Sequence, residues 1–252
     1  MKVRTKSAFQ SLPMVIQEWK NCTKCEMGKH VRNHVFIDTI PPEKPTEATR
    51  ADIVFIGEGP GMVEDVKAIP FAGPAGRLLR QAIAESGAEC SHCGETGYDE
   101  KEGTACAYCL GNGLIKIALL NLLVCRPYNQ KHVNPGNRPP TKEEVANCMP
   151  RLVAMLKQLN PVTIFMLGQE PQSYISVLRN ELAKAGRCDI EFVCMKHPAY
   201  LLRQEAVNNS SLLYTQYVQQ MTHYFEHYFN CNRLDSLQEQ GTRAGSPRAK
   251  RT

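Results

Sequence analysis

Apolar runs that alternate with helix-like segments are the feature that most constrains how this chain can fold. Continuous apolar runs indicate strands buried on both faces, which is typical of parallel sheets. We therefore predict an α/β protein, a three-layer α/β/α sandwich on a mostly parallel four-stranded sheet. The expected strands are residues 53–57, 114–125, 161–168 and 189–198, and the expected helices cover 75–86, 141–159 and 211–229.

Loops at the carboxyl ends of these strands are the expected site, because open parallel sheets bind ligands there. The loop after the first strand, GEGPGMVEDVKAIPFAGPAG, is rich in glycine and proline. It lacks the third glycine of a dinucleotide fingerprint and the Lys-Ser/Thr pair of a phosphate-binding loop. Its acids, Glu58 and the pair Glu64-Asp65, also repel phosphate, and the pair suits the first turn of a helix. The loop is therefore not a simple phosphate site.

Length and composition indicate one sizeable globular domain, since the chain has 252 residues and 42% hydrophobic content. We expect that domain to cover residues 1–230, with an inserted hairpin at 88–113 and a basic, disordered tail at 231–252. A net charge of +5 is compatible with a polyanionic partner but does not require one. No apolar run is long enough to span a bilayer, so we expect a cytoplasmic protein without a membrane partner.

Eleven cysteines in a reducing compartment favour metal ligation over disulfides. The insertion carries one C-x2-C pair, twelve further residues and a second C-x2-C pair, a spacing typical of tetrahedral zinc sites. We predict a small zinc-clipped hairpin that braces a long loop or contacts DNA or a protein partner. Its ligands would be Cys90, Cys93, Cys106 and Cys109.

Five motifs, in this order, carry a resemblance to a known family. They are GEGPG…ED…PFAGPAGRLL, LLN…VCRP, TKEEVANCMPRL, FMLG and HPAYLLR. Together they resemble the uracil-DNA glycosylase superfamily, specifically its iron–sulfur-containing family 4 type, over roughly residues 15–88 and 114–205. The resemblance implies a monofunctional enzyme of base excision repair that flips uracil out of DNA and leaves an abasic site. We expect it to work as a monomer.

Cleavage of an N-glycosidic bond passes through an oxocarbenium-like sugar and a departing base anion. The resemblance implies that Glu58 aligns the attacking water, and we expect His197 to donate a hydrogen bond to uracil O2. The Asn121 amide can meet O4 and N3–H together, while the Phe71 ring can stack on the flipped base. The expected substrate-binding residues are Gly57, Gly59, Phe71 and Asn121.

Two further segments are expected to contact the DNA. Glycines after the PF dipeptide would let the backbone approach closely, and a leucine of HPAYLLR would wedge into the helix that the base has left. An arginine beside that leucine would contact a phosphate. The expected DNA-binding residues are Gly73, Gly76, Leu201, Leu202 and Arg203.

The resemblance also implies an iron–sulfur site. Cys22 and Cys25 form a C-x2-C pair, and Cys125 and Cys148 stand where the family keeps its remaining cluster ligands. Cys148 falls on the apolar face of its helix, so its thiol should point inward. We expect a [4Fe–4S] cluster that ties the N-terminal segment to the sheet. Zinc accepts the same four cysteines and is the alternative.

Other interpretations remain open at this point. Taken singly, Phe71 also fits a core position, Asn121 a strand-end cap, and His197 a packed histidine before a proline. Ala68 stands where the resembled motif usually has glycine, which favours considering a glycosylase for another modified base. A non-catalytic DNA- or partner-binding module is the alternative from a different class. The joint presence of Glu58, Asn121 and His197 argues against it.

Overall fold

The computed structural model describes residues 11–90, 93–94, 96–106, 113–129, 136–208 and 211–244. The chain divides into two compact units, Met1–Leu79 with Lys116–Asn209 and Arg80–Ile115 with Ser210–Thr252. The first unit contains the central sheet, and the second contains the cysteine-rich insertion and the C-terminal helix. No described helix has both the length and the apolar character needed to cross a bilayer.

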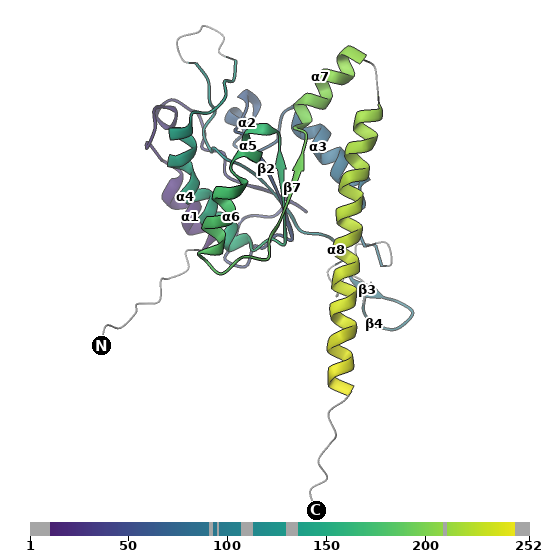
Figure 1. The fold of residues 1–252 in the computed structure, drawn as a ribbon. Helices are drawn as coiled ribbons and strands as arrows, with labels where there is room; N and C mark the ends of the chain where they lie inside the picture. The colour runs from purple at the N-terminus through teal and green to yellow at the C-terminus, as the bar shows by residue number, and fades with distance from the viewer. Residues whose placement is uncertain are drawn as a thin grey trace, which may run out of the picture. The chain divides into compact units, whose positions relative to one another are not determined.

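A five-stranded sheet forms the centre of the first unit (Figure 1), in the order β1-β5-β2-β6-β7. Four strands run parallel, and β1 pairs with β5 in the antiparallel sense. The α/β prediction is thus confirmed, but the sheet has five strands where four were predicted. The sequence did not reveal β1, because this strand has only three residues and no apolar run. The strands are β1 (Asp38–Ile40), β2 (Ile53–Gly57), β5 (Ile117–Asn121), β6 (Thr163–Leu167) and β7 (Glu191–Met195).

The three central strands β2, β5 and β6 are buried at every residue, as continuous apolar runs require. One face, which includes Val54 and Leu120, packs against α1 (Leu12–Trp19), α4 (Lys142–Leu159) and α6 (Ile175–Ala183). On the other face, the rings of Phe55 and Phe165 stack with centroids 4.6 Å apart. Helices therefore flank a sheet that excludes water from both faces. The remaining elements of this unit are η1 (Glu26–Lys29), α2 (Met62–Lys67), α5 (Gln169–Ser173) and α7 (Pro198–Asn208).

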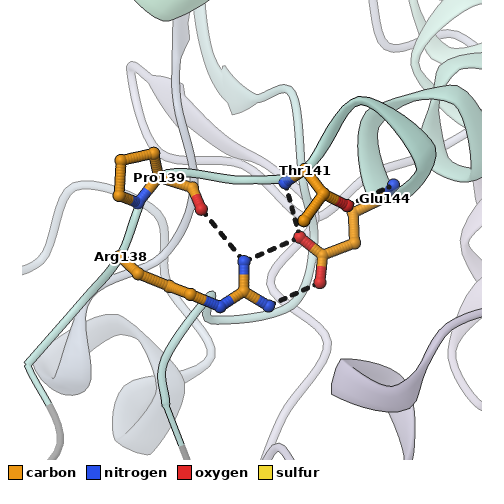
Figure 2. Close-up of polar contacts among 4 residues, drawn as sticks. All are labelled: Arg138, Pro139, Thr141 and Glu144. Carbon is orange, nitrogen blue, oxygen red and sulfur yellow. Dashed lines mark hydrogen bonds and ion pairs between the residues drawn. The ribbon is translucent and has the colours of Figure 1, made fainter.

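Helix α4 begins where its capping box predicts. The Thr141 hydroxyl accepts a hydrogen bond from the Glu144 N–H at 3.2 Å, and the Glu144 carboxylate accepts one from the Thr141 N–H at 2.8 Å. The Arg138 guanidinium also donates hydrogen bonds to both carboxylate oxygens of Glu144 (Figure 2), at N···O distances of 2.9 and 2.5 Å. The hydrogen bond from Arg138 is the main cause that lowers the pKa of Glu144. The start of α4, the helix that contains Cys148, is therefore held by hydrogen bonds between Glu144 and both Thr141 and Arg138.

The second unit contains an antiparallel hairpin of β3 (Tyr98–Asp99) and β4 (Thr104–Ala105), together with α8 (Leu212–Ala244). The boundary between the two units falls within α3 (Pro74–Glu85). The prediction of a disordered tail is wrong for residues 231–244, which continue α8. That segment has no proline, and eight of its 14 residues are Leu, Gln, Arg, Glu or Ala, which favour helix. Residues 245–252 of the tail lie outside the described residues.

Ala68 ends α2 in the left-handed conformation, with φ 57° and ψ 22°, and its N–H donates to the Glu64 carbonyl at 2.8 Å. Glycine is the residue that favours this helix-ending geometry, because a Cβ there clashes with the backbone. The alanine thus keeps the turn that a glycine would form, at a steric cost. Its presence is no reason to expect a differently shaped pocket.

The left-handed alanine predicts a stabilising substitution. Ala68→Gly should raise the free energy of unfolding by up to about 1 kcal/mol, because the relieved clash exceeds the added entropy of the unfolded chain. Urea denaturation measures this change. Ala154→Gly within right-handed α4 is the matched control and should lower the free energy by about the same amount. Equal destabilisation by both substitutions would contradict the strain at Ala68.

Candidate active site and metal sites

A cavity of about 270 Å³ lies where the carboxyl ends of β2 and β5 meet the segment after β7. It brings together three side chains predicted from the sequence, those of Phe71, Asn121 and His197, and three predicted glycines, Gly59, Gly73 and Gly76. Open α/β sheets place their ligands at this edge. The lining residues are Gly59, Gly61, Met62, Val63, Glu64, Phe71, Gly73, Pro74, Ala75, Gly76, Asn121, Asn137, His197 and Ala199.

Gly57 makes room for the two residues expected to hold the base. It is the register partner of Asn121 across β2 and β5. A Cβ at Gly57 would lie 2.5 Å from Asn121 Oδ1 and 2.7 Å from Phe71 Cζ. The glycine therefore leaves the space in which the buried amide and ring lie side by side.

Phe71 is held in a strained backbone conformation, with φ 54°. A Cβ at Gly76 would lie 1.8 Å from the Phe71 carbonyl oxygen, so only glycine permits this approach. Similarly, a Cβ at Gly73 would lie 3.0 Å from the Glu64 carboxylate. Both glycines were predicted to let the DNA approach, but the space beside Gly73 is taken by Glu64 and the space beside Gly76, in the first turn of α3, by the Phe71 backbone. Their contact with DNA stays a prediction.

His197 is a neutral hydrogen-bond donor in this structure. Its Nδ1 accepts a hydrogen bond from the Ala199 N–H at 3.1 Å, so the proton of the uncharged ring is on Nε2. Burial and, to a lesser extent, the nearby charge of Arg203 lower the pKa of His197 to about 4, although the charge of Glu64 acts in the opposite sense. At neutral pH the ring thus offers one N–H and no charge.

Glu58 follows β2 directly and is half-buried. Burial raises its pKa, and the like charge of Glu170 raises it further. Among the described residues, no hydrogen bond engages the Glu58 side chain, and this residue is not part of the cavity lining. Glu58 therefore lies next to Gly59 of the cavity lining, and its carboxylate makes no hydrogen bond within the described part of the chain.

Glu64 is a cavity residue to which the sequence interpretation gave no part in the site. One carboxylate oxygen accepts from the Gly61 N–H at 3.0 Å and the other from the Gly73 N–H at 2.7 Å. Glu64 therefore closes the loop between these glycines. The sequence could have indicated part of this role, because a glutamate three residues after a helix N-cap occupies the capping-box position. Its negative charge also faces His197.

Asn137 is a second cavity residue that the sequence interpretation missed. Its Nδ2 donates to the Pro60 carbonyl at 3.4 Å, and its Oδ1 accepts from Arg126 Nε at 2.8 Å. These bonds fasten the segment after β5 to the GEGPG loop. No sequence pattern links two segments this far apart in the chain.

The HPAYLLR segment forms the start of α7, and the structure corrects one of its predicted roles. Leu201 is only 4% exposed and packs in the core, so it is not available as a wedge between bases. Leu202 is half-buried and Arg203 is exposed. These two residues remain as the predicted DNA contacts of this segment.

The four cysteines expected to bind a cluster gather in the first unit. Cys125 and Cys148 are buried, and Cys22 and Cys25 pack against the same core. Burial raises the pKa of the Cys125 thiol, and the neighbouring sulfurs of Cys148, Cys25 and Cys22 raise it further. The N-terminal segment is fastened nearby, since the Val35 N–H donates to the Val124 carbonyl at 2.8 Å. Four convergent thiols suit a group that accepts thiolate ligands.

The cysteines of the insertion converge more tightly. The sulfurs of Cys90, Cys93 and Cys106 lie within 4.8 Å of one another, and those of Cys90 and Cys106 are 3.9 Å apart. Thiolates that surround one zinc ion at about 2.3 Å lie about 3.8 Å from each other, so this spacing fits zinc. Cys109, the fourth predicted ligand, lies outside the described residues.

The two cysteine sets differ in spacing. Within the part of the chain that the structure describes, the only group of three or more metal-ligating atoms this close is the one in the insertion. Cys22, Cys25, Cys125 and Cys148 do not form a group of this kind.

Comparison with known proteins identifies the family. A model of the uracil DNA glycosylase superfamily matches residues 45–222, well over half of the chain. The type-4 uracil-DNA glycosylase of Archaeoglobus fulgidus is 32% identical over 167 residues, which are 66% of this chain and 64% of that protein. The protein of the same name from Saccharolobus solfataricus is 30% identical, over 66% of this chain and 60% of its own length. The match to these two relatives thus spans less than two thirds of their length.

A third type-4 uracil-DNA glycosylase, from Thermotoga maritima, is 29% identical over 77% of this chain and 85% of its own length. The matched segments contain the motifs after β2, β5 and β7 that line the cavity. The resemblance drawn from the sequence is confirmed, and the chain belongs to the uracil-DNA glycosylase superfamily.

Proposed function

We propose that this protein is a monofunctional uracil-DNA glycosylase that hydrolyses the bond between uracil and its sugar and leaves an abasic site. The observation that carries the proposal is one cavity that combines the Asn121 amide, the Phe71 ring and the His197 imidazole. The names of the relatives support the same activity. As an enzyme of base excision repair it would act wherever the DNA is held, and we propose that it does so as a monomer.

The cavity suits recognition of a flipped uracil. The Asn121 side chain offers one donor and one acceptor that match O4 and N3–H of uracil, whereas cytosine presents an amino group and an unprotonated N3. Phe71 offers a flat apolar surface on which the ring can stack. Stacking accepts any base, so selection for uracil is assigned to Asn121, whose amide has room beside Gly57, and to the size of the cavity.

The bond cleavage follows from the neighbouring groups. As the C1′–N1 bond breaks, its electron pair moves into the uracil ring, and the neutral His197 Nε2–H donates to the O2 that becomes negative. The ionised Glu58 stabilises the positive sugar and accepts a proton from the water that adds to C1′. No lysine is found among the residues lining the cavity in the described structure, which supports hydrolysis without a Schiff-base step.

We propose a [4Fe–4S] cluster for Cys22, Cys25, Cys125 and Cys148, and zinc for Cys90, Cys93, Cys106 and Cys109. The four convergent thiols of the first set suit a cluster, and the close spacing of the second set suits a single ion. Each group would act as a structural crosslink. In the second unit, Phe229 of α8 packs against Cys90 and Cys106, so zinc there would brace the helix as well as the hairpin.

The DNA itself would be held around the cavity. We propose Leu202 as the residue that fills the gap left by the base and Arg203 as a phosphate contact, with further backbone contacts at Gly73 and Gly76. The zinc hairpin would brace its loop and offer a surface to a protein partner. The proposed glycosylase activity does not depend on the assignment of these DNA and partner contacts.

The role of Glu58 predicts a large loss of rate on substitution. Glu58→Gln should lower the single-turnover rate of uracil release by at least about 100-fold, because the carboxylate is lost while its shape is kept. The assay follows alkali-labile sites in fluorescent duplexes with uracil opposite G. Glu143→Gln, an exposed glutamate of α4, is the control and should leave the rate unchanged. Parental activity in Glu58→Gln together with loss in Glu64→Gln would transfer the role to Glu64.

The pair of Glu58 and Glu170 predicts a shift in pH dependence. If ionised Glu58 is required, the rate falls as pH drops through the pKa of Glu58, which Glu170 raises. Glu170→Gln removes the like charge, lowers the pKa of Glu58 and should move the acid limb of the pH–rate profile to lower pH. A limb that stays in place or moves to higher pH would show that another group governs it.

The two cysteine sites predict separable metal contents. The purified protein should contain both iron and zinc by elemental analysis. Cys106→Ser should remove the zinc and keep the iron, and Cys148→Ser should do the reverse, because the two ligand sets share no residue. Cys188→Ser, at an exposed cysteine, is the control for both metals. Zinc retained at the parental level in Cys106→Ser would refute the hairpin site.

A further inference from the structure

Arg151 is a fully buried cation on α4, one turn after Cys148. Its exposed fraction is 0%, and it is the largest of the fully buried side chains. None of the ion pairs found among the described residues includes it, and its Nε has no hydrogen-bond partner in the part of the chain that the structure describes. A guanidinium stays protonated in proteins, so a positive charge is buried here without a carboxylate partner.

One side of the guanidinium holds the end of β5. Its Nη2 donates to the Asn121 carbonyl at 3.0 Å and to the Leu122 carbonyl at 2.6 Å. The Leu122 N–H meanwhile donates to the Gly57 carbonyl at 2.9 Å. The backbone that carries the Asn121 side chain into the cavity is thus fixed by Gly57 from β2 and by Arg151 from α4.

The guanidinium also lies near sulfur atoms. Its Nη1 lies 3.7 Å from the Met155 sulfur. Burial lowers the pKa of Arg151, and the groups that act most strongly against this are the thiols of Cys148, then Cys125, then Cys22. These three are members of the proposed cluster site. Thiolates that bind a metal cluster are anionic, so they supply the negative charge that the buried guanidinium lacks.

We infer that Arg151 is a positioning residue that links the cluster site to the uracil site, because its guanidinium holds the Asn121 backbone and lies one turn of α4 from the cluster ligand Cys148. The inference rests on the proposed cluster and the proposed uracil pocket. The ligated thiolates keep the guanidinium in place, and the guanidinium keeps the end of β5 in the position that aligns the Asn121 amide. The cluster site then contributes to base recognition without touching the DNA.

Three variants of the full-length protein test the link. Arg151→Met removes the charge and the donors but keeps the length of the side chain. Arg151→Lys keeps the charge but loses the planar fork that meets two carbonyls at once. Lys157→Met, at an exposed position of α4, removes one positive charge at a distance from both sites and is the control.

Two readouts that do not depend on turnover are measured for each iron-bearing variant. One is the reduction potential of the bound cluster. The other is the affinity for a duplex with 2′-fluoro-2′-deoxyuridine, a uracil nucleotide whose glycosidic bond resists cleavage, relative to a thymine duplex. In Arg151→Met we expect a lower potential, because a nearby positive charge is lost, and a preference for uracil reduced about tenfold or more, because hydrogen bonds from a charged group are lost. Arg151→Lys should restore the potential but not the preference.

The outcomes separate the inference from the proposals beneath it. Parental potential and parental uracil preference in Arg151→Met would overturn the inference alone. If Arg151→Met fails to fold or to take up iron, Arg151→Lys decides, and a parental uracil preference there would overturn the role of the fork. An iron-free parent protein would overturn the proposed cluster, and the link with it. A Lys157→Met protein that changes as Arg151→Met does would also contradict a specific link.

Discussion

The parallel pairing of β2 with β5 is the constraint on which the candidate site depends. It sets Gly57 opposite Asn121, and the missing side chain of the glycine leaves the space that the Asn121 amide and the Phe71 ring share. A slip of one residue in this register would turn Asn121 to the other face of the sheet. The apolar core that fixes the register of β2 and β5 therefore also fixes the position of the Asn121 amide that would bind a base.

Much of this arrangement follows from the sequence. Continuous apolar runs located β2, β5, β6 and β7, and a capping box located the start of α4. Order along the chain then placed Asn121 and His197 at one edge of the sheet. Periodicity could not find β1, because three residues at a sheet edge carry no pattern, and it could not show that α8 continues through residues 231–244.

What the sequence missed at the site depends on contacts between distant segments. Leu201 looked like a surface leucine near the DNA, but tertiary packing buries it. Glu64 looked like a helix-start acid, although its carboxylate also closes the loop onto Gly73. Gly76 looked like a place for DNA to approach, yet the Phe71 backbone fills its space. Local patterns report on neighbours in the chain, whereas these roles are set by neighbours in space.

The central claim is that the space beside Gly57 lets Asn121 and Phe71 hold a flipped uracil. The most direct test is the single-turnover rate of base release from matched duplexes containing uracil or thymine, for the parent protein and for Gly57→Ala. We expect the parent to release only uracil and Gly57→Ala, whose Cβ would lie 2.5 Å from Asn121 Oδ1, to lose that release. A folded, metal-bearing parent that releases no uracil would contradict the proposed function. Parental release by Gly57→Ala would contradict the geometry.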